Sequence, residues 1–331
     1  MPTYWRLWSE WCEQHYERRL PTCAPFLTSV TLLSVQGTLP MRWLAAEYGC
    51  DIVYTEELID KKIVACTVVQ NEALKTTDFV DKSGGVAFRT TPEEKHRLVA
   101  QIGTAGAVLA LQAAERLAPF VSAVDINMGC PVHFSTSGGM GAALLQKPDT
   151  IEDILKTLRR NLPHTCGLSC KIRLLPTTEN TCNLAGMISH CGVDALAVHG
   201  RYVPQRPRDP AHWKEIAAVC SRVRNIPIIA NGDVFCYADF QGIRDATGAA
   251  AAMCARAAQW NASVFRPDGL LAPADVRAAY ARACVRWDNN IGNTKYCLRE
   301  MLVEDIGLES AEGRALGAVK TNAELARFYH H

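Results

Sequence analysis

The sequence lacks the features that mark membrane proteins, zinc proteins and disulfide-stapled secreted domains. No run approaches the ~18 consecutive apolar residues that span a bilayer, and the start of the chain carries charges instead of the apolar core of a secretory signal. The 14 cysteines include no C-x-x-C pair, and nothing completes a zinc site around Cys166 and Cys170. We therefore expect a soluble protein of the cytoplasm, or of the nucleus, with reduced thiols, no membrane contact and no metal.

A charge excess of either sign is also missing, because 35 Lys and Arg balance 34 Asp and Glu. A nucleic-acid partner would therefore have to bind a local basic patch. With 22 Gly, 16 Pro and 8% aromatic residues, the chain is neither collagen-like nor of a typical disordered class. Its 331 residues are 48% hydrophobic, which is enough to bury a large core.

Short apolar runs alternate with helix-like stretches between about residue 30 and residue 256. The runs are nearly continuous, as is typical of parallel strands buried on both faces. The predicted strands are Val30–Val35, Asp51–Tyr54, Leu98–Ile102, Ala123–Asn127, Leu168–Ile172, Ala195–His199, Ile226–Ala230 and Ala249–Cys254. The helical stretches between them include Thr38–Tyr48, Ala105–Leu117, Thr150–Arg160, Thr178–His190 and Pro210–Arg222.

Eight strands with intervening helices predict an α/β fold, a (β/α)8 TIM barrel, followed by a smaller all-helical domain. A doubly wound sheet is the alternative, but its G-x-G-x-x-G fingerprint is absent, since Gly138–Gly141 does not complete it. The predicted organisation is an atypical extension over 1–29, a barrel over 30–265 and helices over 266–331. The extension carries Trp5, Trp8 and Trp11, which could share one face of a helix.

The predicted C-terminal helices carry a segregated charge pattern. Five acidic residues, Glu300, Glu304, Asp305, Glu309 and Glu312, follow a basic stretch that contains a single acid, Asp288. Two interpretations remain open: a cationic stripe that binds phosphates, or bases that pair with the acidic run. The bases are Arg277, Arg282, Arg286, Lys295 and Arg299.

Polar residues follow the apolar runs at the points where the strands end. In a barrel these carboxyl ends form one rim, where the active site lies. Taken singly, each residue could be structural, as a buried thiol or a satisfied histidine often is, but chance does not readily place all of them on one rim. They are Gln101, Asn127, Cys130, Lys171, His199, Asn231, Gly232, Ala255 and Arg256.

The chemistry of this rim suits flavin mononucleotide (FMN). The turns Asn231-Gly232 and Ala255-Arg256 follow the last two strands, where barrels often hold a phosphate. Lys171, His199 and Gln101 could donate to the carbonyls and ring nitrogens of a flavin. Cys130 lies on a Gly-Cys-Pro turn beside a glycine-rich loop, and a thiol with its ordinary pKa of ~8.5 is protonated at neutral pH and can act as a general acid.

Two sets of motifs stand out between about Gly37 and Leu302. The first set is Asp125-Ile-Asn-Met-Gly-Cys-Pro131, Ser135-Thr-Ser-Gly-Gly-Met-Gly-Ala-Ala-Leu-Leu145, Cys170-Lys-Ile-Arg173, Ala197-Val-His-Gly-Arg201 and Ile226-Pro-Ile-Ile-Ala-Asn-Gly232. The second set is Gly37-Thr-Leu-Pro-Met-Arg42, Asp51-Ile-Val-Tyr54, Glu56-Glu-Leu-Ile-Asp60 and Asn293-Thr-Lys-Tyr-Cys297. The first set resembles the tRNA dihydrouridine synthases, and the second resembles the eukaryotic branch of that family, which acts on position 20 of tRNA.

The resemblance implies a flavin-dependent barrel and a helical tRNA-binding domain. NADPH would reduce FMN, the reduced flavin would pass hydride to C6 of a uridine, and Cys130 would protonate C5. Asn127 would position the uracil, and Arg201 and the five bases of the C-terminal helices would contact substrate. The residues implied to hold FMN are Gln101, Lys171, His199, Asn231, Gly232, Asp233, Ala255 and Arg256.

Two departures from the family pattern leave alternatives open. Leu32–Gln36 replaces the usual Ala-Pro-Met-type segment that backs the flavin ring, and Asp233 puts an acid beside the expected phosphate, which is unfavourable unless it points away. One alternative is a tRNA-binding homologue that has lost flavin and catalysis. The other is a flavin-dependent barrel reductase of small molecules.

Overall fold

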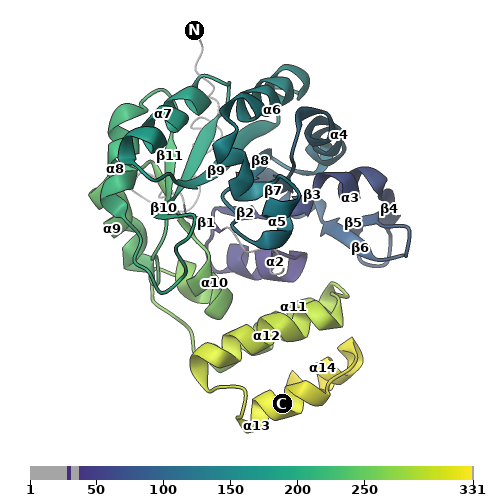
Figure 1. Cartoon of the computed structure of the whole chain (residues 1–331). Coiled ribbons are helices and arrows are strands. Elements are labelled where there is room, and N and C mark those ends of the chain that lie inside the picture. Colours follow the sequence, from purple (N-terminus) through teal and green to yellow (C-terminus); the bar gives the residue numbers. More distant parts are fainter. Residues whose placement is uncertain (1–27, 31–36, 330–331) are drawn as a thin grey trace, which may run out of the picture.

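The computed structural model describes residues 28–30 and 37–329 of the chain (Figure 1). The tryptophans of the predicted N-terminal extension and the segment Leu32–Gln36 lie outside the described residues. The strand expected at Val30–Val35 is described only as Thr28–Val30, which extends it two residues toward the N-terminus.

Eight parallel strands close into a barrel. β1 pairs with β2 on one side and with β12 on the other, and β2 also pairs with β7, so the ring has no open edge. This closure confirms the predicted TIM barrel and excludes the doubly wound sheet, whose first and last strands would not pair. The strands are β1 (Thr28–Val30), β2 (Ile52–Tyr54), β7 (Leu98–Gly103), β8 (Ala123–Met128), β9 (Gly167–Leu174), β10 (Ala195–Tyr202), β11 (Ile228–Asn231) and β12 (Ala251–Cys254).

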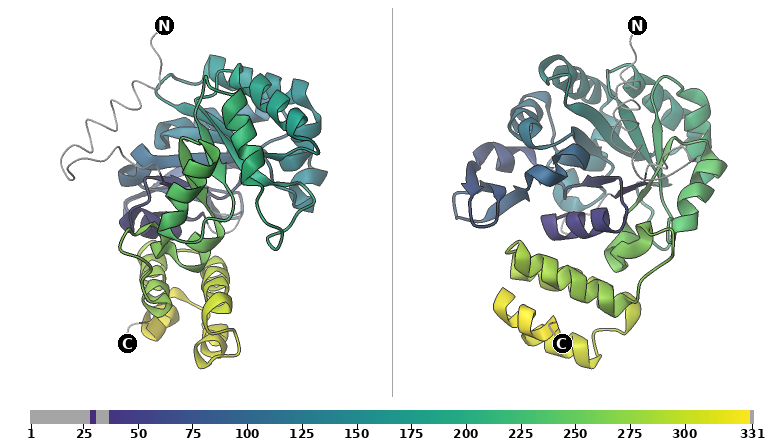
Figure 2. Two further views of the ribbon diagram at one scale, coloured as in Figure 1. Left: turned by 90° about the vertical axis from the view of Figure 1, so that its left-hand side faces the viewer. Right: turned by 180° about the vertical axis from the view of Figure 1, so that it is seen from behind.

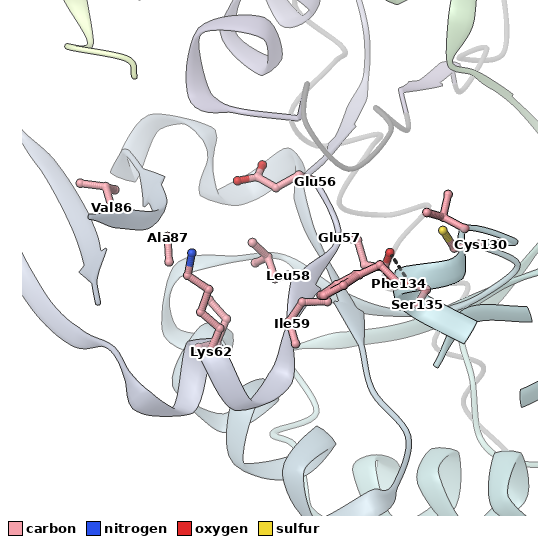
Figure 3. A pocket seen from close by; sticks show the side chains of 12 residues that line it. Glu56, Glu57, Leu58, Ile59, Lys62, Val86, Ala87, Cys130, Phe134 and Ser135 are labelled. Atoms are coloured by element: carbon pink, nitrogen blue, oxygen red, sulfur yellow. Dashed lines mark hydrogen bonds between the residues drawn. The ribbon is translucent and has the colours of Figure 1, made fainter. Parts of the chain in front are cut away.

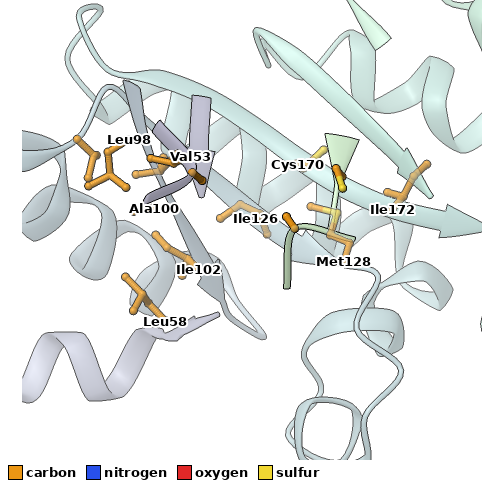
Figure 4. Close-up of a cluster of buried hydrophobic side chains, with 14 of the residues drawn as sticks. Val53, Leu58, Leu98, Ala100, Ile102, Ile126, Met128, Cys170 and Ile172 are labelled. Carbon is orange, nitrogen blue, oxygen red and sulfur yellow. The ribbon is translucent and has the colours of Figure 1, made fainter. Parts of the chain in front are cut away.

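Helices cover the outside of the barrel, each following a strand (Figure 2). Side chains along the strands alternate between this helical layer and the interior. Ile126 and Met128 of β8 and Ile172 of β9 belong to the outer core (Figure 4), whereas Val99, Ala197 and Met253 form a separate cluster inside the barrel. The covering helices are α2 (Leu39–Glu47), α4 (Ala107–Leu117), α6 (Pro148–Asn161), α7 (Thr178–Ser189), α8 (Trp213–Arg222) and α9 (Tyr237–Thr247).

A small antiparallel sheet, which the sequence pattern did not predict, is inserted between the second and third barrel strands. Its first strand is exposed along nearly its whole length, so it lacks the apolar run that marked the barrel strands. The inserted elements are β3 (Leu58–Ile59), α3 (Asp60–Ala65), β4 (Thr67–Asn71), β5 (Thr76–Val80), β6 (Val86–Thr90) and the 3-10 helix η1 (Pro92–Arg97).

A buried arginine ties this insertion to the barrel. Arg42 of α2 is 1% exposed. Its Nε and one terminal nitrogen donate to the two carboxylate oxygens of Glu94, at 2.9 and 2.7 Å. It also donates to the carbonyl oxygens of Arg89 and Gly37. The ion pair with Glu94 joins α2 to η1, and the hydrogen bond to the Arg89 carbonyl oxygen joins α2 to β6.

The chain after the barrel is helical, as predicted from Ala272 onward. α11 packs against α2 through Trp43 and Trp287, whose ring centroids lie 5.6 Å apart, and Arg89 donates to the Trp287 carbonyl oxygen at 2.5 Å. The boundaries at 29/30 and 265/266 stay predictions. The helices are α11 (Pro273–Arg286), α12 (Ile291–Asp305), α13 (Ala311–Ala318) and α14 (Asn322–Tyr329).

Within the described ranges, no helix has both the length and the apolar character required to cross a bilayer.

We expect Arg42→Ala to lower the free energy of unfolding by about 3–5 kcal/mol, because it leaves the Glu94 carboxylate buried without its partner. Urea denaturation at neutral pH measures this loss. The exposed pair of Lys75 and Glu72, which lie 3.2 Å apart, provides the control, since Lys75→Ala should change stability by less than about 0.5 kcal/mol. Equal losses in the two variants would contradict the assigned role of Arg42.

Candidate active site

A layer of hydrogen-bonded polar side chains crosses the barrel interior near the carboxyl ends of the strands. Asp125 of β8 is fully buried and accepts from Gln101 Nε2 at 2.9 Å and from Ser169 Oγ at 2.7 Å. Burial raises the pKa of Asp125 to about 6, although both hydrogen bonds and the nearby Lys171 act in the opposite direction. The layer orients Gln101 through a single buried carboxyl group.

Asn127 links this layer to the turn that carries Cys130. Its Nδ2 donates to Gln101 Oε1 at 3.2 Å, and its Oδ1 accepts from the backbone nitrogens of Gly129 and Cys130, each at 3.0 Å. The structure therefore brings the predicted residues Gln101, Asn127 and Cys130 together. Both polar atoms of the Asn127 amide have protein partners, so this side chain fixes the position of Cys130.

The Cys130 thiol is half-buried and faces α5 (His133–Ser137). Ser135 of this short helix is 1% exposed, and its hydroxyl donates to both carboxylate oxygens of Glu57 at 3.0 Å. Burial raises the pKa of Cys130 above its ordinary value, so the thiol is protonated at neutral pH. That is the state a general acid requires.

Glu57 and Ser135 were not among the predicted site residues. Both line a hollow of about 440 Å³ that also contacts Cys130 (Figure 3). In the sequence, Glu56-Glu57 and Ser135 stand out only as members of longer motifs. A carboxylate after β2 and a serine on α5, 78 positions apart, carry no local pattern that pairs them.

Lys171 of β9 is a half-buried cation with no hydrogen bond or ion pair to any residue that the structure describes. Burial and, next to it, the neighbouring Arg173 lower the pKa of Lys171 to about 8, while Asp125 acts against both. Arg173, another residue outside the predicted site, donates from Nε to the Gly129 carbonyl oxygen at 2.9 Å and so supports the Cys130 turn.

His199 lies beside these cations as a neutral imidazole. Burial, followed by the charges of Lys171, Arg173, Arg201 and Arg256, holds its pKa well below the ordinary value. A terminal nitrogen of Arg201 lies 3.3 Å from His199 Nε2. Because a guanidinium only donates, Nε2 is the acceptor and the ring proton is on Nδ1.

Arg201, predicted to contact substrate, is only 3% exposed, and its guanidinium is engaged within the protein. Its guanidinium pairs with Asp233 and donates from Nε to the Asp209 carbonyl oxygen at 2.6 Å. Arg256 binds the same Asp233 oxygen at 2.6 Å. Asp233 is therefore the shared counter-ion of two arginines. Their positive charges offset its negative charge, which would otherwise be unfavourable beside a phosphate.

The turns after β11 and β12 lie side by side, because Asn231 is in register with Met253. Asn231 Nδ2 donates to the Met253 carbonyl oxygen at 2.9 Å. Gly232 has φ +132°, and a Cβ there would lie 2.7 Å from that of Ala211, so the turn requires glycine. Gly232 and Ala255 are thus brought to one corner of the rim, as predicted.

The five bases of the C-terminal helices do not form one stripe. The expected phosphate contact of Arg277 is wrong, because it is 2% exposed and pairs with Asp305 at 2.6 Å and with Glu312 at 2.9 Å. Lys295 donates to the Gly317 and Val319 carbonyl oxygens at the end of α13, at 2.8 and 2.7 Å. Arg286 is exposed but stacks on Trp43 and Trp287.

Arg282 and Arg299 are exposed, and the structure gives neither an ion pair within its described ranges. They are therefore the two bases of the set that stay open to a ligand. Residues 28–30 and 37–329 contain no group of three or more His, Cys, Asp or Glu arranged to hold a metal ion.

We expect Lys171→Met to raise the free energy of unfolding of the ligand-free protein by about 1–2 kcal/mol at pH 7, because it removes a partly desolvated charge that has no partner among the described residues. A lysine pKa lowered from 10.5 to about 8 destabilises the fold below pH 8. The penalty is relieved as pH rises from 8 to 10.5.

Urea denaturation across that pH range measures the difference between the two proteins. The advantage of Lys171→Met over the wild type should shrink as the pH rises. The exposed Lys75→Met provides the control and should show no such trend. A constant difference between pH 7 and pH 10.5 would contradict the assigned environment of Lys171.

The sequence is similar to known proteins over most of its length. The family model described as dihydrouridine synthase (Dus) matches residues 36–326. The tRNA-dihydrouridine(20) synthase [NAD(P)+] of Schizosaccharomyces pombe is 40% identical over 275 residues, which are 80% of this chain and 57% of that protein. The synthase of the same name from Saccharomyces cerevisiae is 38% identical over 288 residues, 80% of this chain and 74% of that protein.

Among solved structures, a 6-hydroxypseudooxynicotine amine oxidase from Pseudomonas geniculata N1 has a TM-score of 0.51 at 11% identity, covering 75% of this chain and 47% of that one. This likeness concerns the fold alone. The chain spans less than two thirds of the fission-yeast relative and about three quarters of the budding-yeast relative. The match of the family model over most of the chain shows that it belongs to the dihydrouridine synthase family.

Proposed function

We propose that this protein reduces uridine to 5,6-dihydrouridine in tRNA, at position 20, with FMN as cofactor and NADPH as reductant. The observation that carries the proposal is the Cys130 turn, which Asn127 holds at the barrel rim beside Lys171, a cation without a partner among the described residues. Burial raises the pKa of the Cys130 thiol and keeps it protonated. The relatives named as tRNA-dihydrouridine(20) synthases [NAD(P)+] support the substrate and the reductant. We place the reaction in the cytoplasm, with the nucleus as the alternative compartment.

The residues of the rim fit FMN. Lys171 is a partly buried cation without a protein partner among the described residues, and a cation of this kind suits the N1–C2 region of a reduced flavin. We assign Lys171 and Gln101 to the ring, with the neutral His199 beside them. Gly232, Ala255 and Arg256 line the corner assigned to the phosphate, where Asn231 and Asp233 hold the turn and the arginines in place. When bound, reduced FMN supplies the hydride.

Cys130 supplies the proton. A dihydrouridine differs from uridine by two hydrogens, one on C5 and one on C6, so the hydride at C6 requires a proton at C5. The Asn127 amide holds the backbone of Cys130, and the raised thiol pKa keeps the proton on sulfur until it is used. The target base has to leave the tRNA fold to reach this rim.

Recognition of tRNA would include the C-terminal helices. Arg282 on α11 and Arg299 on α12 are exposed, and their charges are available to phosphates. Arg277 and Lys295 instead stabilise the helices internally. The proposed tRNA contact therefore rests on two of the five bases.

We expect Cys130→Ala to retain flavin and NADPH oxidation but to form dihydrouridine about 10²–10⁴-fold more slowly, the usual loss for a positioned general acid. Single-turnover reduction of unmodified tRNA, followed by mass spectrometry of its nucleosides, measures the loss. Cys182→Ala, which removes a half-buried thiol on α7, provides the control and should react at the wild-type rate.

Three other results would contradict the proposal. Dihydrouridine formation by Cys130→Ala at the wild-type rate would exclude Cys130 as the acid. Purified wild-type protein without a flavin absorbance band, and unable to bind added FMN, would favour the non-catalytic homologue. Turnover of free pyrimidines but not of tRNA would favour a small-molecule reductase.

We expect Arg282→Ala and Arg299→Ala each to weaken tRNA binding and to flatten the dependence of log Kd on log salt by about one unit, since each would remove one phosphate contact. Binding titrations from 50 to about 300 mM salt measure the slope. Arg160→Ala, an exposed arginine on α6, is the matched control. If both arginine variants keep the wild-type salt dependence, Arg282 and Arg299 do not contact tRNA phosphates, and the proposed role of these helices is wrong.

A further inference from the structure

A hydrogen-bonded carboxylate and hydroxyl line the same hollow as the Cys130 side chain (Figure 3). Glu57 comes from the segment between β2 and β3, and Ser135 from α5. The Ser135 hydroxyl lies 3.0 Å from each Glu57 oxygen. The side chains of Glu57 and Ser135 both lie close enough to Cys130 to affect the pKa of its thiol.

Two glycines make this arrangement sterically possible. A Cβ at Gly103, the last residue of β7, would lie 2.6 Å from Glu57 Oε1. A Cβ at Gly141, which has φ +57°, would lie 2.6 Å from the Cys130 carbonyl oxygen and 3.2 Å from the Ser135 Cβ. The backbone therefore leaves space for the carboxylate on one side and lets the Cys130 turn approach α5 on the other.

The charged surroundings single out Glu57 as a proton carrier. Glu57 has no cation against it among the described residues, and its polar neighbours are Ser135 and Cys130. Glu56 and Lys62 line the same hollow, but Glu56 faces Arg42 at 3.8 Å and Lys62 faces Asp81 at 3.7 Å.

From β9, Lys171 and Arg173 face Cys130. Burial raises the pKa of Glu57 above its ordinary value. The carboxyl group therefore holds a proton at higher pH than an exposed glutamate does.

We propose that Glu57 and Ser135 form a relay that returns a proton from the solvent in the hollow to Cys130 after each turnover. This inference rests on the proposed function of Cys130 as the acid. Once the thiol has protonated C5, its sulfur is a thiolate. A solvent proton first converts Glu57 to its carboxyl form. Ser135 then passes its hydroxyl proton to the sulfur and takes the Glu57 proton, which restores the carboxylate that accepts from Ser135. Glu57 acts through Cys130 and is a positioning residue.

The pKa of the Cys130 thiol tests the relay without any turnover. Glu57→Gln keeps the shape but removes a negative charge beside the thiol, so the midpoint of Cys130 alkylation by iodoacetamide should shift to lower pH by about 0.5–1 unit. Peptide mass spectrometry separates Cys130 from the other thiols. Glu56→Gln, which removes the second carboxylate of the hollow, should leave the midpoint unchanged, and Glu57→Asp should restore it toward the wild-type value.

The pH profile of single-turnover and steady-state dihydrouridine formation tests the return of the proton. Glu57→Gln should keep the first turnover, for which Cys130 is already protonated, and should slow later turnovers at least tenfold above pH 7. Ser135→Ala should behave similarly, with Ser137→Ala on the same helix as its control.

Unchanged alkylation midpoints together with unchanged later turnovers, in Glu57→Gln protein that melts like the wild type, would overturn the relay. A wild-type protein that forms no dihydrouridine would instead refute the proposed function, and the alkylation midpoints would still report whether Glu57 acts on the thiol.

Discussion

The closure of eight parallel strands forces every second side chain of each strand into a narrow interior, and the site depends on how that interior is filled. Part of this interior is filled by an apolar cluster that includes Val99, Ala197 and Met253. Beside this apolar cluster, Asp125 is fully buried and accepts hydrogen bonds from side chains of β7 and β9. A buried carboxyl group without such partners would cost several kcal/mol, so this layer fixes the side chains on which the Cys130 turn is built.

Charge balance then decides which basic side chains are left for a ligand. Asp233 binds both Arg201 and Arg256, and Arg173 donates to the Gly129 carbonyl oxygen. Lys171 has no such partner among the described residues and carries a lowered pKa. Burial and the cations around His199 keep that imidazole neutral by lowering its pKa. Among the described residues the rim is therefore electropositive, and the Lys171 ammonium group is left for a ligand, which suits an electron-rich ring.

The inserted antiparallel sheet and the C-terminal helices are joined to the barrel by polar contacts as well as by packing. Arg42 connects α2 to Glu94, and Arg89 reaches from β6 to the end of α11. These contacts join segments up to 198 positions apart in the chain. The same helices leave Arg282 and Arg299 exposed, so the elements that brace the barrel also present two arginines at the surface without an ion pair to any described residue.

The sequence by itself determined the barrel, the all-helical C-terminal segment and most of the rim. Apolar runs of the right length mark strands, and parallel strands bring their carboxyl ends to one side, so the ends of these runs are enough to place Gln101, Cys130 and Lys171 on one rim. Only the tertiary structure decided which charges are engaged. Arg201 meets Asp233 and Arg277 meets Glu312 across 32 and 35 positions, and Glu57 meets Ser135 across 78. Such pairs carry no periodic signal, because their partners are chosen by the folding of distant loops and helices.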